Sequence, residues 1–154
     1  MDIKLQYEFV VSSRGVLIDF CRNLNELDFI VENSNFGRGS IRNLLVHIGN
    51  TYEFWIGKHA LKKIMNIKEY SAIKSVNEAE KYFEQVNDLI KEFISVFQNQ
   101  YNEELNIIMS DKTINVTPLK SFTHVITHEF HHKGQILSFC RYLGYTPVDT
   151  DIIR

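Results

Sequence analysis

Residues 124–136 read HVITHEFHHKGQI and hold most of the histidine in the chain: His124, His128, His131 and His132. An α-helix turns by about 100° per residue, so these four side chains fall within an arc of about 100° on one helix. The helical pattern extends over about 120–144, and its apolar stripe of Val125, Ile136, Phe139 and Leu143 overlaps one edge of that arc. We therefore expect a long helix with histidines at the margin of its buried face.

The same stretch spells H-E-x-x-H from His128 to His132, a pattern that zinc proteases place on a helix. Such proteases take their third ligand from a later residue, yet the 22 residues after His132 contain no histidine and no glutamate. The extended motif would need glycine and histidine where the chain has Gln135 and Ser138. Two carboxylates in the tail are the remaining downstream alternatives, Asp149 and Asp151. The pattern does not favour a protease.

Glu129 would be the general base in a protease, but it points about 100° away from His128 on the helix. It lies four residues before Lys133, the spacing of a stabilising surface ion pair. It can equally be an ordinary charge on the helix surface, paired with Lys133, so both roles stay open.

An upstream histidine, His47, is the best candidate for a third ligand. It lies in a second helical pattern, about 41–65, which follows the turn-rich stretch 32–39 (ENSNFGRG) and which Ser40 can cap. His47 is at the margin of the apolar face of Ile41, Leu44, Leu45, Ile48, Tyr52 and Trp55. Helical bundles build metal sites from facing helices, so His47, His128 and His132 can share one ion. His59 lies about 120° around the helix and is interpreted as a surface residue.

The remaining polar residues near these histidines have open roles. His124 and His131 can orient a ligand ring, shuttle protons, or simply be solvated. Gln135 and Thr51 each lie about one turn from a candidate ligand, which makes them further candidates for orienting its ring.

The rest of the chain predicts one helical domain over residues 1–154. Apolar stripes indicate two more helices, about 5–22 and 76–99, the latter capped by Ser75 or Asn77. Residues 104–117 predict two short β segments around a polar turn, and Gly144 is a stop for the last helix. With only two prolines and no linker or repeat, the expected fold is an all-α four-helix bundle with a small hairpin.

Composition argues against a nucleic-acid-binding surface, a membrane span and a secreted protein. The net charge is −2, which gives no basic surface for nucleic acid. No window approaches the ~18 apolar residues of a membrane span, and the N-terminus shows no signal-peptide pattern. Cys21 and Cys140 form no metal or redox motif and are expected to be reduced and buried, as in a cytoplasmic protein.

Two segments together identify a family. HVITHEFHHKGQI, continuing as LSFCRYLGYTPVDTD, resembles the C-terminal signature of the DinB/YfiT-like putative metalloenzymes, with Lys133 in place of a common arginine. GSIRNLLVHIGNTYEFWIG, residues 39–57, resembles the second-helix motif of that family, in which an acidic residue and a tryptophan follow the histidine. With the spacing between the motifs, the resemblance covers nearly the whole chain.

The resemblance implies a four-helix bundle with a long crossover and a divalent metal, zinc or nickel among the candidates, held by His47, His128 and His132. It also implies a homodimer, and an activity that ranges from transfer or isomerisation with thiols such as bacillithiol or mycothiol to no assigned reaction. It does not imply DNA binding.

Three hypotheses follow, with no catalytic residue assigned. The leading one is a metal-dependent enzyme acting on a small molecule, either as a hydrolase or as a thiol-dependent transferase. The second is a metal-binding or sensor module without turnover. The third is a structural dimer whose histidines are incidental. A metal position open to solvent favours the enzyme, whereas a position sealed by tyrosine and phenylalanine favours a structural role.

Overall fold

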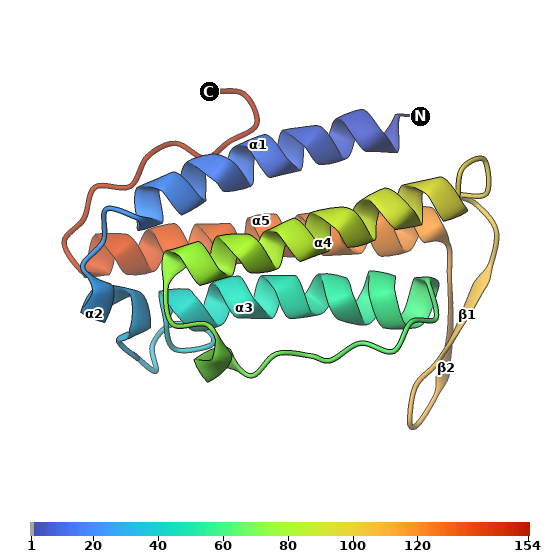
Figure 1. Cartoon of the computed structure of the whole chain (residues 1–154), viewed down its shortest axis with the longest axis horizontal. Coiled ribbons are helices and arrows are strands. Elements are labelled where there is room, and N and C mark those ends of the chain that lie inside the picture. The colour runs from blue at the N-terminus through green and yellow to red at the C-terminus, as the bar shows by residue number, and fades with distance from the viewer. Residues whose placement is uncertain (1) are drawn as a thin grey trace.

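The computed structural model describes residues 2–154 and is mostly helical, with one small β-hairpin (Figure 1). The elements in chain order are α1 (Ile3–Cys21), α2 (Glu26–Ile30), α3 (Ile41–Tyr52), a π-helix η1 (Glu53–Ala60), a 3₁₀ turn η2 (Tyr70–Ala72), α4 (Val76–Val96), β1 (Leu105–Ile108), β2 (Thr113–Val116) and α5 (Pro118–Tyr142). The four predicted helices are thus present close to their expected positions, as α1, α3 with η1, α4 and α5, and the expected hairpin is confirmed.

The four long helices lie side by side around one apolar core (Figure 1). α3 packs against both α4 and α5, and α1 packs across α4 and α5. The apolar stripes seen in the sequence are the surfaces that meet, and the largest fully buried apolar side chains among them are Tyr52, Tyr82, Phe93, Phe122 and Phe139. The arrangement sets α3 beside α5, the two helices that carry the candidate ligands.

The helix ends follow from capping side chains. Ser40 accepts a hydrogen bond from the backbone N–H of Asn43 at 3.0 Å, and Ser75 accepts one from Glu78 at 3.2 Å. Both are the expected N-caps, which supply a partner for otherwise unpaired N–H groups in the first turn. Past the C-terminus of α5, Gly144 has a φ of +93°, so the predicted stop is confirmed.

The second helix differs from its prediction after Tyr52. It continues as the π-helix η1 and ends at Ala60, whereas the predicted helix ran to residue 65. Hydrogen bonds spaced by five residues widen each turn, so each residue rotates by less than 100° and an α-helical wheel misplaces the residues that follow. The surface assignment of His59 is wrong, independently of this widening: it is 6% exposed, and its ring lies 4.5 Å from that of Phe54. At 100° per residue it lies only about 20° from Tyr52, on the apolar face.

Gly49 marks the closest approach of α3 to α4. A Cβ at this position would lie 2.4 Å from Cε1 of Tyr82, whose ring is buried and whose hydroxyl donates to Asn50 at 2.8 Å. We expect Gly49→Ala to lower the free energy of unfolding by about 1–3 kcal/mol, because the clash outweighs the better helix propensity of alanine. Urea denaturation measures the change.

Gly15→Ala is the matched control, since it lies within α1 and its Cβ would meet nothing within 4 Å. It should raise the free energy of unfolding by up to about 1 kcal/mol. Equal effects of the two substitutions would contradict the close packing of α3 on α4.

Candidate metal site

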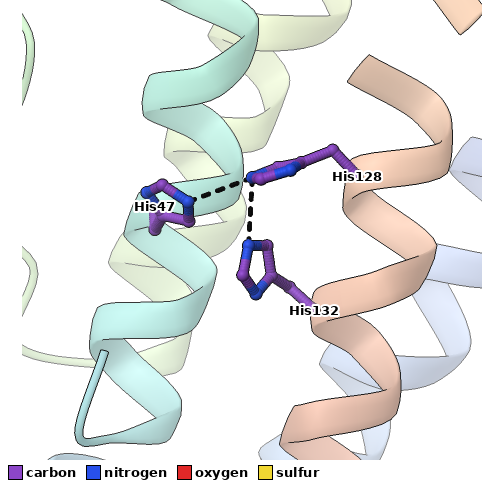
Figure 2. A group of neighbouring side chains, drawn as sticks. All are labelled: His47, His128 and His132. Atoms are coloured by element: carbon purple, nitrogen blue, oxygen red, sulfur yellow. Dashed lines mark hydrogen bonds between the residues drawn. The ribbon is translucent and has the colours of Figure 1, made fainter. Parts of the chain in front are cut away.

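Three histidines converge between α3 and α5, namely His47 from α3 with His128 and His132 from α5 (Figure 2). Nε2 of His128 lies 3.0 Å from Nε2 of His47 and 3.0 Å from Nε2 of His132. Two nitrogens bound to one tetrahedral zinc at 2.0–2.1 Å are separated by about 3.3 Å. The three ligand atoms all lie within 4.8 Å of one another, so the group can hold a metal ion.

The rings are set in the neutral form that a metal requires. Nδ1 of His132 lies 2.7 Å from Oε1 of Gln135, an acceptor, so Nδ1 carries the proton and Nε2 presents its lone pair. Burial, followed by the nearby guanidinium of Arg38, lowers the pKa of His47 to about 3. Burial also lowers the pKa of His128 to about 4 and shifts the pKa of His132 downward. Neutral imidazole is the ligand form.

The i, i+4 pair on α5 is aimed at α3 by the residue between its members. Glu129 is fully buried about 100° around the helix from His128, where Nε and Nη2 of Arg14 from α1 each donate to its carboxylate at 2.8 Å. The hydroxyl of Tyr52 on α3 donates to the same carboxylate at 2.5 Å. This cluster ties α1, α3 and α5 together and fixes the rotation of α5.

The alternative that Glu129 is a surface charge paired with Lys133 is therefore wrong. Lys133 is 2% exposed, and its ammonium donates to the hydroxyl of Ser13 and to the carbonyl of Thr150. At 100° per residue both charges fall on the apolar side of α5, with Glu129 about 20° from Ile136. Their partners on α1 and in the C-terminal segment leave no local pattern in the sequence of α5. With its carboxylate held by Arg14, Glu129 is not placed to act as a base at the histidines.

A cleft of about 390 Å³ opens beside the histidines and is lined by His47 and His128. Its other polar side chains include Arg38 and His124, and its aromatic walls come from Phe54, Trp55 and Tyr70. Within the described part of the chain the lining contains no aspartate or glutamate. A metal position at the histidines would therefore be reachable from solvent, the feature that favours an enzyme over a sealed structural site.

The other candidate residues separate into those at the site and those behind it. His124 is exposed, and its ring lies 5.7 Å from the His128 ring and 5.2 Å from that of Trp55. His131 is exposed, and its Nε2 lies 3.3 Å from the amide nitrogen of Gln135, the side chain whose oxygen orients His132. Thr51 donates to the backbone carbonyl of His47, not to its ring.

Arg38 is the site residue that sequence reasoning missed. Its Nη2 lies 3.3 Å from Nε2 of His47. The available signal was an arginine between two glycines in the turn-rich stretch that precedes the ligand helix.

Asp149 and Asp151, the alternative downstream ligands, belong to a segment that lies along α1, where Arg154 contacts Ser12 (Figure 1). Neither belongs to the histidine group in the described residues. The third member of the group is the upstream His47.

The fold and the site define a class: a mostly helical protein with a candidate divalent-metal site between two neighbouring helices. The chain belongs to the DinB family, whose family model matches residues 1–154. A solved structure of a DinB-like protein, YjoA from Bacillus subtilis, is similar with a TM-score of 0.66 at 17% identity. The similarity covers 92% of this chain and 94% of that one, and it shows the shared fold. A comparison with curated proteins gave no match.

The family identification from the two sequence segments is thereby confirmed. Within residues 2–154, no helix combines the length and apolar character needed to cross a membrane.

Proposed function

We propose that residues 1–154 form a single DinB-type four-helix bundle with a long crossover from η1 to α4, acting as a divalent-metal-dependent enzyme. His47, His128 and His132 are the ligands in this proposal. The observation that carries it is the convergence of three Nε2 atoms at the edge of an open cleft. Zinc and nickel are the best candidates, since both accept imidazole nitrogen.

A metal held by three histidines with an open position supplies an activated water or a bound thiolate. The residues of the chain then have separate tasks. Gln135 holds the ring of His132 in a fixed orientation. His124 lines the cleft beside His128, where an exposed imidazole can exchange protons with a bound molecule. The aromatic walls exclude water from one side of the cleft.

Thiol transfer with a low-molecular-weight thiol co-substrate is the first of two candidate reactions, and hydrolysis of a small molecule is the second. Neither cysteine of the chain is placed to supply the reacting thiol, which supports a thiol co-substrate from outside the protein. Cys21 and Cys140 are buried, and burial raises the pKa of Cys140 to about 11, which leaves it without nucleophilic thiolate. We further propose a cytoplasmic homodimer.

A non-catalytic metal-binding or sensor module is the alternative. It is favoured by the lack of any carboxylate in the described lining of the cleft, which leaves His124 as the exposed proton-transfer group. A thiol-conjugation screen of the zinc- and nickel-loaded protein separates the two. Turnover that the His124→Asn substitution reduces supports the enzyme, and metal binding without turnover of any electrophile or hydrolysable substrate supports the module.

The proposal predicts stoichiometric binding of a divalent metal that His128→Ala loses. Removal of one of three ligands should weaken zinc affinity by at least about 100-fold, beyond the usual effect of losing a group that only orients a ligand. Elemental analysis after dialysis against zinc measures the content. His131→Ala is the matched control, because it removes a neighbouring exposed histidine that is outside the converging group. Equal zinc in the wild type and in His128→Ala would refute the site.

A further inference from the structure

Arg38 stands at the rim of the cleft with its charge uncompensated. Its side chain is exposed, its Nη2 lies 3.3 Å from Nε2 of His47, and it lines the cleft beside His128. No carboxylate within residues 2–154 forms an ion pair with it, although other arginines of the chain, including Arg14, Arg22 and Arg42, do form such pairs. Apart from its contact with His47, the guanidinium pairs with no other side chain of residues 2–154.

The backbone at Arg38 is one that favours glycine. Its φ is +63°, in the left-handed region where an L side chain is strained, and the next residue, Gly39, has a φ of +85°. The loop holds this shape through backbone groups: the N–H of Asn33 donates to the carbonyl of Gly39 at 2.7 Å, and the amide of Asn43 donates to the carbonyl of Arg38 at 2.9 Å.

None of these contacts uses the guanidinium. An arginine where glycine would fit better is strain of the kind that proteins retain at binding sites.

The charge around the cleft selects the sign of its ligand. Once the lone pair of His47 is engaged by a dication, it can no longer accept from Arg38, and the two positive charges repel each other. The guanidinium is then available at the cleft rim, beside a second positive charge and with no carboxylate in the described lining. Both charges attract an anion.

The shape of the donor and the cleft walls narrow the ligand class. A guanidinium is a planar fork that matches a carboxylate or a phosphate with two parallel hydrogen bonds. Phe54, Trp55 and Tyr70 provide an apolar wall on which a hydrocarbon or aromatic group can pack.

We propose that Arg38 is the substrate-binding residue that selects small organic molecules carrying a carboxylate, with their apolar part against Trp55. This inference rests on the proposed metal site, because a metal held by Nε2 of His47 would take the lone pair that Arg38 contacts. It adds the substrate class, an organic carboxylate, to the proposed function.

The test uses the only tryptophan of the chain, Trp55, as the reporter, since its fluorescence responds to a ligand in the cleft. Zinc-loaded protein of measured zinc content is titrated with phenylacetate, with its neutral analogue phenylacetamide and with inorganic phosphate. We expect phenylacetate to bind at least about tenfold more tightly than phenylacetamide, because only the carboxylate pairs with the guanidinium.

Arg38→Gly should weaken phenylacetate binding by at least about tenfold, while the zinc content is unchanged and the melting temperature is equal or higher. Arg38→Lys should retain part of the affinity. Arg141→Gln, which removes an exposed charge away from the cleft, should leave it unchanged. Loss of binding together with a higher melting temperature cannot come from a merely structural role of Arg38.

Three results would overturn the inference in distinguishable ways. Equal phenylacetate affinity in zinc-loaded wild type and Arg38→Gly removes the role of Arg38 and leaves the metal site standing. Arg38-dependent phosphate binding at least as tight as that of phenylacetate replaces the carboxylate with another oxyanion. A wild type that binds no stoichiometric zinc overturns the proposed function, and this inference with it.

Discussion

Arg14→Met should lower the free energy of unfolding by about 3–5 kcal/mol, the usual effect of leaving a buried charge without its partner. Arg14 is 3% exposed and donates two hydrogen bonds to the fully buried carboxylate of Glu129. Its guanidinium carbon also lies 4.5 Å from the centre of the Phe83 ring. Methionine keeps the apolar stem of arginine, so the loss comes mainly from the charge. Urea denaturation monitored by circular dichroism measures it.

The reciprocal change, Glu129→Leu, leaves Arg14 buried without its carboxylate and should be destabilising to a similar extent. The double variant should be less destabilised than the sum of the two single variants, because it leaves neither charge unpaired. Tyr52 would still lose its acceptor, so the double variant is not expected to match the wild type.

Arg22→Met is the matched control, since Arg22 pairs with Asp19 and Glu80 on the surface. It should change the stability little, as exposed ion pairs usually do. If Arg14→Met were as mild as Arg22→Met, the carboxylate of Glu129 would be open to water in solution, and the cluster could not fix α5.

The positions of the long helices along the chain, and the helix faces on which the three histidines lie, could be predicted because both depend on local patterns. Helix-period apolar stripes place the buried faces, and Ser40 and Ser75 cap the helices where predicted. Spacing of i, i+4 puts His128 and His132 on one side of α5, and the position of His47 on the margin of its stripe turns it toward the same side.

What could not be predicted depends on contacts between distant residues or on loop geometry. Glu129 is paired with a residue 115 positions earlier, and no local pattern reports that distance. The surface assignment of His59 rests on its angle to His47 alone, although at 100° per residue it lies about 20° from Tyr52 and 40° from Trp55, within the apolar stripe, and it is buried. Arg38 reaches His47 only because its loop adopts left-handed backbone conformations. The shape of a turn decided this contact, and hydrophobic periodicity does not encode it.

Zinc at 100-fold above its dissociation constant should stabilise the folded protein by about 2.7 kcal/mol, and at 1,000-fold by about 4.1 kcal/mol. The physical reason is that the ligands exist as a group only in the folded state: His47 and His128 are 81 residues apart in sequence. For a chain of this size, such a gain raises the melting temperature by roughly 5–15 °C. Thermal unfolding with zinc, then with excess chelator, measures the gain and its reversal.

His132→Ala should remove most of this stabilisation, while His131→Ala, one residue earlier on α5 and outside the converging group, should retain it. The comparison separates binding at the site, which His132→Ala removes, from binding to exposed histidines such as His131, which His132→Ala keeps and His131→Ala reduces. A zinc-dependent rise of equal size in the wild type and in His132→Ala would mean that the ion binds elsewhere. A rise that disappears only in the variants of His47, His128 and His132 would mean that the stabilised state is the one in which α3 and α5 share a metal.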